Sequence, residues 1–171
     1  MVFAVKLEFK NKVKEGILDR VLKAADILAN NHVESGVMSE DEEIQEKALL
    51  NEFGGFSKYE DGPFAGETVL APPRPFIHGG ADLGADLAFA LASDKLKQGF
   101  NVGNAKEALK IIAKQTKMSQ EMAIESNGEG MPNWQKHNEA RTIATKGFDK
   151  PLYTRHGTTF PIESAVVKGG L

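Results

Sequence analysis

Few side chains in this sequence are spaced for catalysis or metal binding. The chain holds four histidines, His32, His78, His137 and His156. None is three or four residues from another, the spacing that places two imidazoles on one helix face. Asp82 and Asp86 lie four residues apart and could pair two carboxylates for acid/base work. No partner group accompanies them, so a solvated helix surface explains this pair better.

Other catalytic motifs are missing as well. The glycines of "GGADLGAD" precede a helical pattern, but they have neither the Lys-Ser/Thr ending of a P-loop nor the Gly-x-Gly-x-x-Gly order of a dinucleotide fingerprint. Ser and His occur without a GxSxG elbow, and the chain has no cysteine for a thiol nucleophile, a disulfide or a thiolate metal site. We therefore expect no enzyme, no cofactor and no metal. A small hydrolase or metal enzyme built from the scattered His and Asp residues stays an alternative.

Composition limits the class of protein further. A chain of 171 residues that is 41% hydrophobic suits one domain with one core. The formal net charge of -3 argues against general nucleic-acid binding. No run of about 18 apolar residues appears, and the N-terminus "MVFAVKLEFK" does not have the layout of a signal peptide. We expect a cytosolic, non-membrane product.

The elements that would position any site begin with a strand over 2–10, where Phe3, Val5, Leu7 and Phe9 alternate with polar residues. An amphipathic helix should follow in "EGILDRVLKAADILANN" and pack on a sheet through the apolar positions Ile17, Leu18, Val21, Leu22, Ala25 and Leu28. "HVESGVM" suits a short strand. "SEDEEIQEKALLNEF" suits a helix with Ser39 as N-cap and Glu42 completing a capping box.

Two longer helices and a last strand complete the expected fold. The first helix, in "GGADLGADLAFALASDKLKQGF", should bury Leu83, Leu87, Ala90, Leu91 and Leu96. The second, in "NAKEALKIIAKQTKMSQEMAIES", should bury Leu109, Ile112, Ala113 and Ala123 and stop at Gly128 and Gly130. From about 128 to 171 the chain is polar and irregular, apart from strand character in "TFPIESAVV". The expected class is α+β, a single domain over 1–171 in which a small mixed sheet packs against two to four helices.

A long irregular segment interrupts this pattern. "NEFGGFSKYEDGPFAGETVLAPPRPF" predicts an extended Gly/Pro-rich loop over about 53–72, and loops of that length are usually functional or disordered. "APPRPF" fixes backbone angles and suits a rigid connector or contact arm. It could equally start the next helix, with Pro75 near the first turn and Phe76 anchored in the core.

The order of these blocks resembles the family of phage neck and tail-completion proteins, which includes the lambda protein Z type of minor tail component. The resemblance is carried by "ALLNEFGG", a glycine-containing loop, "PPRPF" opening a helix, and a C-terminal block with "TI", "KGFDKPL" and a final strand. It covers nearly the whole chain. The chain departs from the family pattern at "YTRHGTTFPIESAV".

The resemblance implies a non-enzymatic virion protein at the head–tail interface, made in the host cytoplasm. Its partners would be copies of itself in a ring, hexameric by family expectation, and neighbouring connector, tail-terminator or tube proteins, without membrane or specific nucleic-acid binding. The central loop would contact an adjacent copy or ring, and Arg74 could pair with a neighbour's carboxylate. The implied subunit contacts are Glu52, Phe53, Gly54, Pro73, Arg74, Pro75, Phe76, Lys150, Pro151 and Leu152. These residues could instead all stabilise the monomer, and the protein could instead be an assembly chaperone or adaptor that the virion does not retain.

Overall fold

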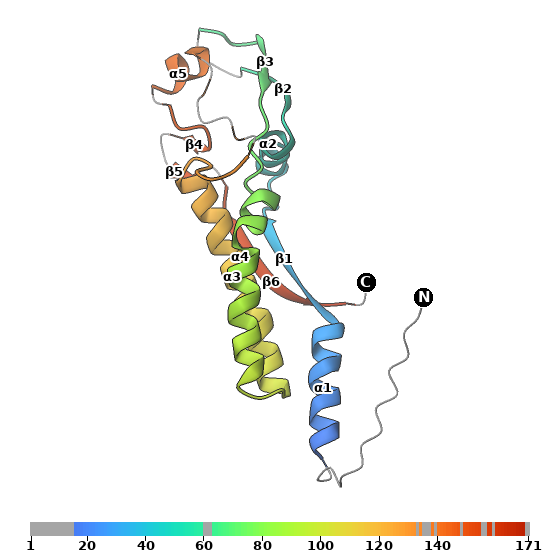
Figure 1. Ribbon diagram of the computed structural model, residues 1–171. Coiled ribbons are helices and arrows are strands. Elements are labelled where there is room, and N and C mark those ends of the chain that lie inside the picture. Colours follow the sequence, from blue (N-terminus) through green and yellow to red (C-terminus); the bar gives the residue numbers. More distant parts are fainter. Residues whose placement is uncertain are drawn as a thin grey trace, which may run out of the picture.

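The computed structural model describes residues 16–59, 63–132, 134, 138, 140–147, 149–154, 157–158 and 160–169. Figure 1 shows an elongated molecule in which an α3–α4 hairpin and α1 form one end, and a β2–β3 hairpin and α5 form the other. The helices are α1 (Ile17–Ala29), α2 (Glu42–Phe53), α3 (His78–Lys97), α4 (Val102–Glu125) and α5 (Ala140–Lys146). The strands are β1 (Asn31–Val37), β2 (Gly55–Lys58), β3 (Thr68–Ala71), β4 (Tyr153–Thr154), β5 (Gly157–Thr158) and β6 (Ile162–Lys168).

The strands form three separate antiparallel pairs, β1–β6, β2–β3 and β4–β5. The predicted α+β class is therefore confirmed, although the described strands pair only antiparallel and not in a mixed sheet. β1 and β6 match the strands predicted in "HVESGVM" and "TFPIESAVV". The strand expected over 2–10 lies outside the described residues.

The α3–α4 hairpin is built on small residues. α3 turns Gly80, Gly84, Ala88 and Ala92 inward, and a Cβ added at Gly84 would lie 1.9 Å from Ser119 Oγ on α4. Glycine here lets the two helix backbones approach closely. Both helices were predicted, but the predicted buried face of α3 is wrong, because its large apolar residues stay on the outside: Leu83, Leu87, Ala90 and Leu91 are exposed and Leu96 is half-buried.

The remaining helices also depart from expectation in detail. α1 forms where its periodicity predicts, but only Ala24 is buried, and Ile17, Leu18, Val21 and Leu22 are exposed. Its predicted apolar face is therefore largely unpacked within the described chain. α2 starts at Glu42 with Asp41 as its N-cap, since Asp41 Oδ1 accepts a hydrogen bond from Glu43 N at 2.9 Å. The predicted Ser39 cap is wrong.

The segment expected as an extended loop contains the β2–β3 hairpin. Gly55 to Lys58 pair with Ala71 to Thr68, so the chain runs out, turns and returns. The C-terminal region is likewise less irregular than expected, because it contains α5 and the β4–β5 pair before β6.

The main core lies where α2, the start of α3, the end of α4 and the C-terminal segment meet. Its buried members are Ala48, Phe76, Ala123, Ile124, Trp134, Leu152, Phe160 and Ile162. Gly128 follows α4 with φ +72°, and its N–H donates to Ala123 O at 2.8 Å, which confirms the predicted stop. No helix in the described ranges is long and apolar enough to cross a membrane.

Candidate functional site

Glu52, in the last turn of α2, is a buried carboxylate that caps α3. Its exposed fraction is 3%. Oε2 accepts a hydrogen bond from Ile77 N at 2.8 Å, and Oε1 accepts one from His78 N at 3.0 Å and also contacts His78 Nδ1. A negative charge at this position satisfies free N–H groups and faces the positive end of the helix dipole. The role of Glu52 in the folded chain is therefore to fix α3 against α2.

Arg74 is buried beside the same junction. Its side chain is buried, with the residue 5% exposed. The backbone N–H of Arg74 donates to Asn51 O at 2.6 Å, and its guanidinium Nη1 lies 3.5 Å from Asn51 Oδ1. Burial lowers the pKa of the guanidinium, and the negative charge of Asp149 acts in the opposite direction. The guanidinium therefore already has a carboxylate of its own chain nearby, and its pairing with a neighbouring copy stays a prediction.

Gly54 and Pro73 close the junction from the other side. Gly54 has φ +74°, and a Cβ there would lie 3.0 Å from Ala71 O and from Pro73 N. Only glycine combines this backbone angle with so close an approach. Pro73 itself is exposed, and Phe53 is 69% exposed with its ring stacked on His78 at a centroid distance of 6.4 Å.

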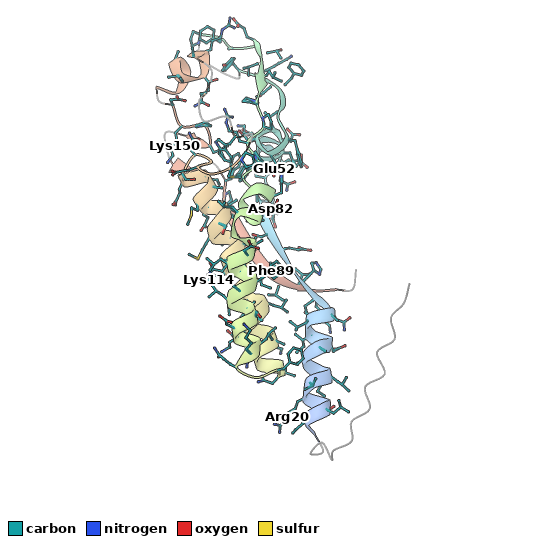
Figure 2. All side chains as sticks on the ribbon, viewed as in Figure 1. Arg20, Glu52, Asp82, Phe89, Lys114 and Lys150 are labelled. Carbon is teal, nitrogen blue, oxygen red and sulfur yellow. The ribbon has the colours of Figure 1, made fainter. Side chains whose placement is uncertain are left out.

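The central and C-terminal sequence blocks meet in the core. Phe76 is fully buried and stacks on Phe160 with centroids 5.1 Å apart, in the same cluster as Leu152. Pro151 is buried and lines a cavity of about 200 Å³ together with Arg74. Pro75 and Lys150 are half-buried, and Figure 2 shows Glu52 and Lys150 in the same upper part of the molecule.

The ten predicted contact residues thus differ in their exposure. Glu52, Gly54, Arg74, Phe76, Pro151 and Leu152 make contacts within the subunit, Pro75 and Lys150 are half-buried, and Phe53 and Pro73 are exposed.

Gln120 is a junction residue that the sequence interpretation missed. It is 1% exposed, its Nε2 donates to Ile77 O at 3.0 Å, and its Oε1 accepts from Ser35 Oγ at 2.6 Å. It therefore ties β1, the start of α3 and α4 together. The sequence feature that could have identified it is a glutamine on the apolar face of a predicted helix. A buried side-chain amide needs hydrogen-bond partners within the protein.

The β2–β3 hairpin, which we call the arm, carries the most exposed aromatic side chain described. Phe56 is 78% exposed and lies opposite Leu70, which is 56% exposed, so both project from one face of the arm. Leu49 and Phe53, at the end of α2 beside the arm, are 56% and 69% exposed. These four exposed apolar side chains belong to α2 and the arm, in the part of the molecule distant from α1 (Figure 1).

Side chains of α5 contact residues between β2 and β3 of the arm. Tyr59 Oη and Thr142 Oγ1 are 2.9 Å apart, Arg141 forms an ion pair with Glu67, and its guanidinium carbon lies 5.4 Å from the centre of the Phe64 ring. These contacts restrain the arm, and restraint lowers the ordering cost of a contact made through it.

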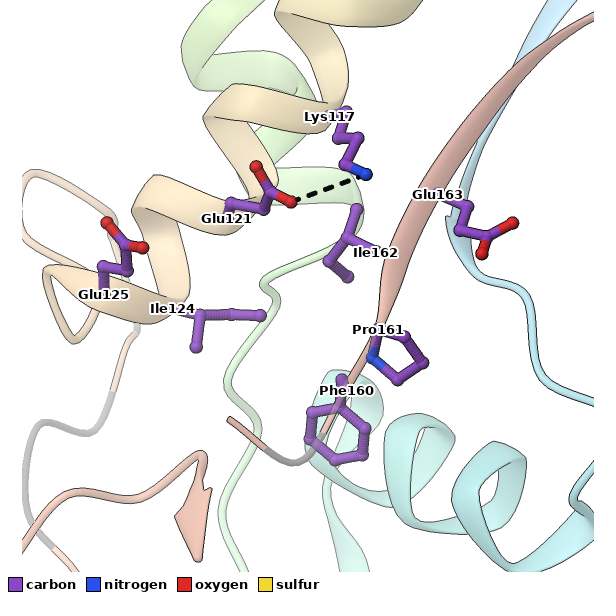
Figure 3. Close-up of a pocket in the computed structure, with 8 residues that line it drawn as sticks. All are labelled: Lys117, Glu121, Ile124, Glu125, Phe160, Pro161, Ile162 and Glu163. Atoms are coloured by element: carbon purple, nitrogen blue, oxygen red, sulfur yellow. Dashed lines mark ion pairs between the residues drawn. The ribbon is translucent and has the colours of Figure 1, made fainter. Parts of the chain in front are cut away.

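A pocket of about 350 Å³ lies between α4 and the start of β6 (Figure 3). Ile124, Phe160 and Ile162 supply its apolar wall, and Lys117 Nζ lies 3.7 Å from Glu121 Oε1 at its rim. Glu163 points away from that ion pair in Figure 3. The rim is a set of surface carboxylates with one lysine, and it converges on no common point.

The described residues assemble no metal-binding group of three or more His, Asp or Glu side chains. His32 lies 3.0 Å from Glu34, His78 contacts Glu52, and Asp82 and Asp86 are both exposed. His137 and His156 lie outside the described residues.

Comparisons with family models, with curated proteins and with solved structures give no match to this chain.

Proposed function

We propose that this protein is a non-enzymatic structural protein of a phage head–tail joint, a neck or tail-completion ring subunit that acts through contacts between subunits. The proposal rests on the family resemblance of the two sequence blocks and on one structural observation. That observation is the arm, a braced hairpin that presents Phe56 and Leu70 to solvent.

An exposed aromatic on a rigid projection fits a docking role better than a catalytic one. Aromatic side chains are enriched at interface centres, where burial from water contributes most of the binding energy. Phe56 is 78% exposed, so most of its apolar surface would leave water when a partner covers it. In the proposed ring, the arm reaches an adjacent copy or the adjoining connector or tail protein.

Phage particles test this function directly. We expect a lysate from a phage with this gene disrupted to contain full heads beside separate tails by electron microscopy, and complementation by the intact gene to restore joined particles. Intact particles in the disrupted phage would reject the proposal.

A second test separates the arm from the fold. Phe56→Ser with Leu70→Thr should leave the circular dichroism spectrum unchanged but fail to complement, whereas Lys58→Ser on the same strand should complement. Washed virions should retain the protein. Its absence from joined virions would favour an assembly chaperone or adaptor.

A further inference from the structure

The α3–α4 hairpin carries a row of large apolar side chains that no described residue covers. Leu83, Leu87 and Leu91 recur every four residues, so they follow one side of α3, and they are 51%, 57% and 39% exposed. On α4, Met118 and Met122 are 43% and 56% exposed. We call these five residues the Leu/Met face.

The two rows lie on the same side of the hairpin. Gly84 and Ser119 mark the point where α3 and α4 touch. Leu83 is one residue before Gly84, and Leu87 is three residues after it. In the same way, Met118 is one residue before Ser119, and Met122 is three residues after it. Antiparallel helices are related by a local two-fold axis, so residues at equal offsets from the contact share one side.

α1 presents a second uncovered apolar surface. Ile17, Leu18, Val21 and Leu22 are 48%, 51%, 36% and 59% exposed, and we call them the α1 face. Their spacing of one, three and four residues gathers them on one broad side of the helix. Polar residues such as Asp19 and Lys23, which pair at 2.9 Å, occupy the other side.

α1 and the Leu/Met face lie on opposite sides of α4. α1 packs beside α4, where Ile27 and Leu109 line a shared groove. Leu109 and Met118 are nine residues apart, about two and a half turns at 3.6 residues per turn, so they lie on opposite sides of α4. Within one chain, α4 therefore separates α1 from the Leu/Met face.

We propose that the α1 face of one copy docks on the Leu/Met face of a second copy of this chain. A surface that pairs with a different surface of the same protein gives a head-to-tail contact, which repeats and closes into a ring when the rotation allows. Because a ring subunit needs such a contact, this inference rests on the proposed function.

The size of the two faces suits a specific interface. Nine partly exposed Leu, Ile, Val and Met side chains, at roughly 80 Å² each, present about 700 Å² of apolar surface. Interfaces are about 57% apolar, so this area corresponds to roughly 1,200 Å² in total, the lower end of stable protein–protein contacts. A contact of this size assembles a ring only when several copies repeat it.

Two single variants of the full chain test this pairing by sedimentation velocity. We expect the wild-type protein to self-associate below about 100 µM. Leu22→Asp and Leu87→Asp should each be monomeric, with self-association weakened at least about tenfold. Mixed in equal amounts, they should form a dimer that grows no further, because each variant keeps the face that the other has lost. Phe89→Asp is the matched control and should associate like the wild type, because Phe89 is 61% exposed but lies on another side of α3, two residues from Leu87.

Three outcomes would overturn the inference. The first is a wild-type monomer throughout the concentration range, and the second is a mixture that stays monomeric while both variants keep the wild-type circular dichroism spectrum. In the third, deletion of residues 1–10 turns a monomer into an oligomer, which would assign one face to the N-terminal segment of the same chain. The lysate experiment is independent, so a correct contact in a protein with another function would still give the mixed dimer.

Discussion

The cap that Glu52 places on α3 can be removed while its side-chain volume is kept. Glu52→Gln retains the shape but removes the charge and turns an amide NH2 toward one of the donors, Ile77 N or His78 N. Glu52→Ala removes both acceptors. Because Glu52 is 3% exposed, water cannot easily replace the lost oxygen atoms.

The expected cost follows from these contacts. Loss of a helix cap costs about 1 kcal/mol, and loss of a charge at the positive end of the helix adds about 0.5–1 kcal/mol. We expect Glu52→Gln to lower the free energy of unfolding by about 2 kcal/mol. Glu52→Ala, which leaves both N–H groups unpaired, should cost about 3 kcal/mol, a decrease in Tm of about 6–12 °C for a chain of this size.

Urea unfolding followed by circular dichroism at one protein concentration measures this cost. The slope of the free energy against urea should stay constant while the midpoint falls. Glu46→Gln, on the exposed surface of the same helix, is the matched control and should change stability by less than about 0.5 kcal/mol. A Glu52→Gln protein as stable as this control would refute the capping role.

Two further predictions concern the packing of the same chain. Arg74→Glu should unfold the protein or lower its stability by about 3–5 kcal/mol, because it places a second negative charge near Asp149 in a buried site; a thermal melt like that of the wild type would contradict this. Gly84→Ala should push α3 away from α4 and lower the free energy of unfolding in urea by about 1–3 kcal/mol. Adding Ser119→Gly to the same chain should restore most of the lost stability if the contact with Ser119 Oγ is the cause.

Local sequence patterns predict where most elements lie. The three- and four-residue spacing of apolar positions locates α1, α3 and α4, and alternation in the last segment locates β6. Phe76 in the core and Gly128 after α4 also follow from local rules for proline-started helices and glycine stops. These features depend on a few neighbouring residues, so a single sequence suffices.

The direction in which an element faces depends on the rest of the chain. Hydropathy alone predicts that Leu83 and Leu87 of α3 are buried. In the structure Gly80 and Gly84 are buried instead, because small residues let α3 and α4 pack closely. The arm is missed because β2 and β3 have four residues each and lie among glycines and prolines, which favour loops. The roles of Glu52 and Arg74 depend on the contact between distant segments, which no local pattern contains.

The β1–β6 pair sets the order in which this chain can fold during synthesis. Ser35 Oγ donates to Glu163 O across 128 residues of sequence. Translation proceeds at 5–20 residues per second, so β6 is synthesised roughly 10 s after β1. Loop closure over that length also slows pairing. A chain that stops before Ile162 lacks this partner for β1, so incomplete chains should be degraded by proteases faster than the full-length protein.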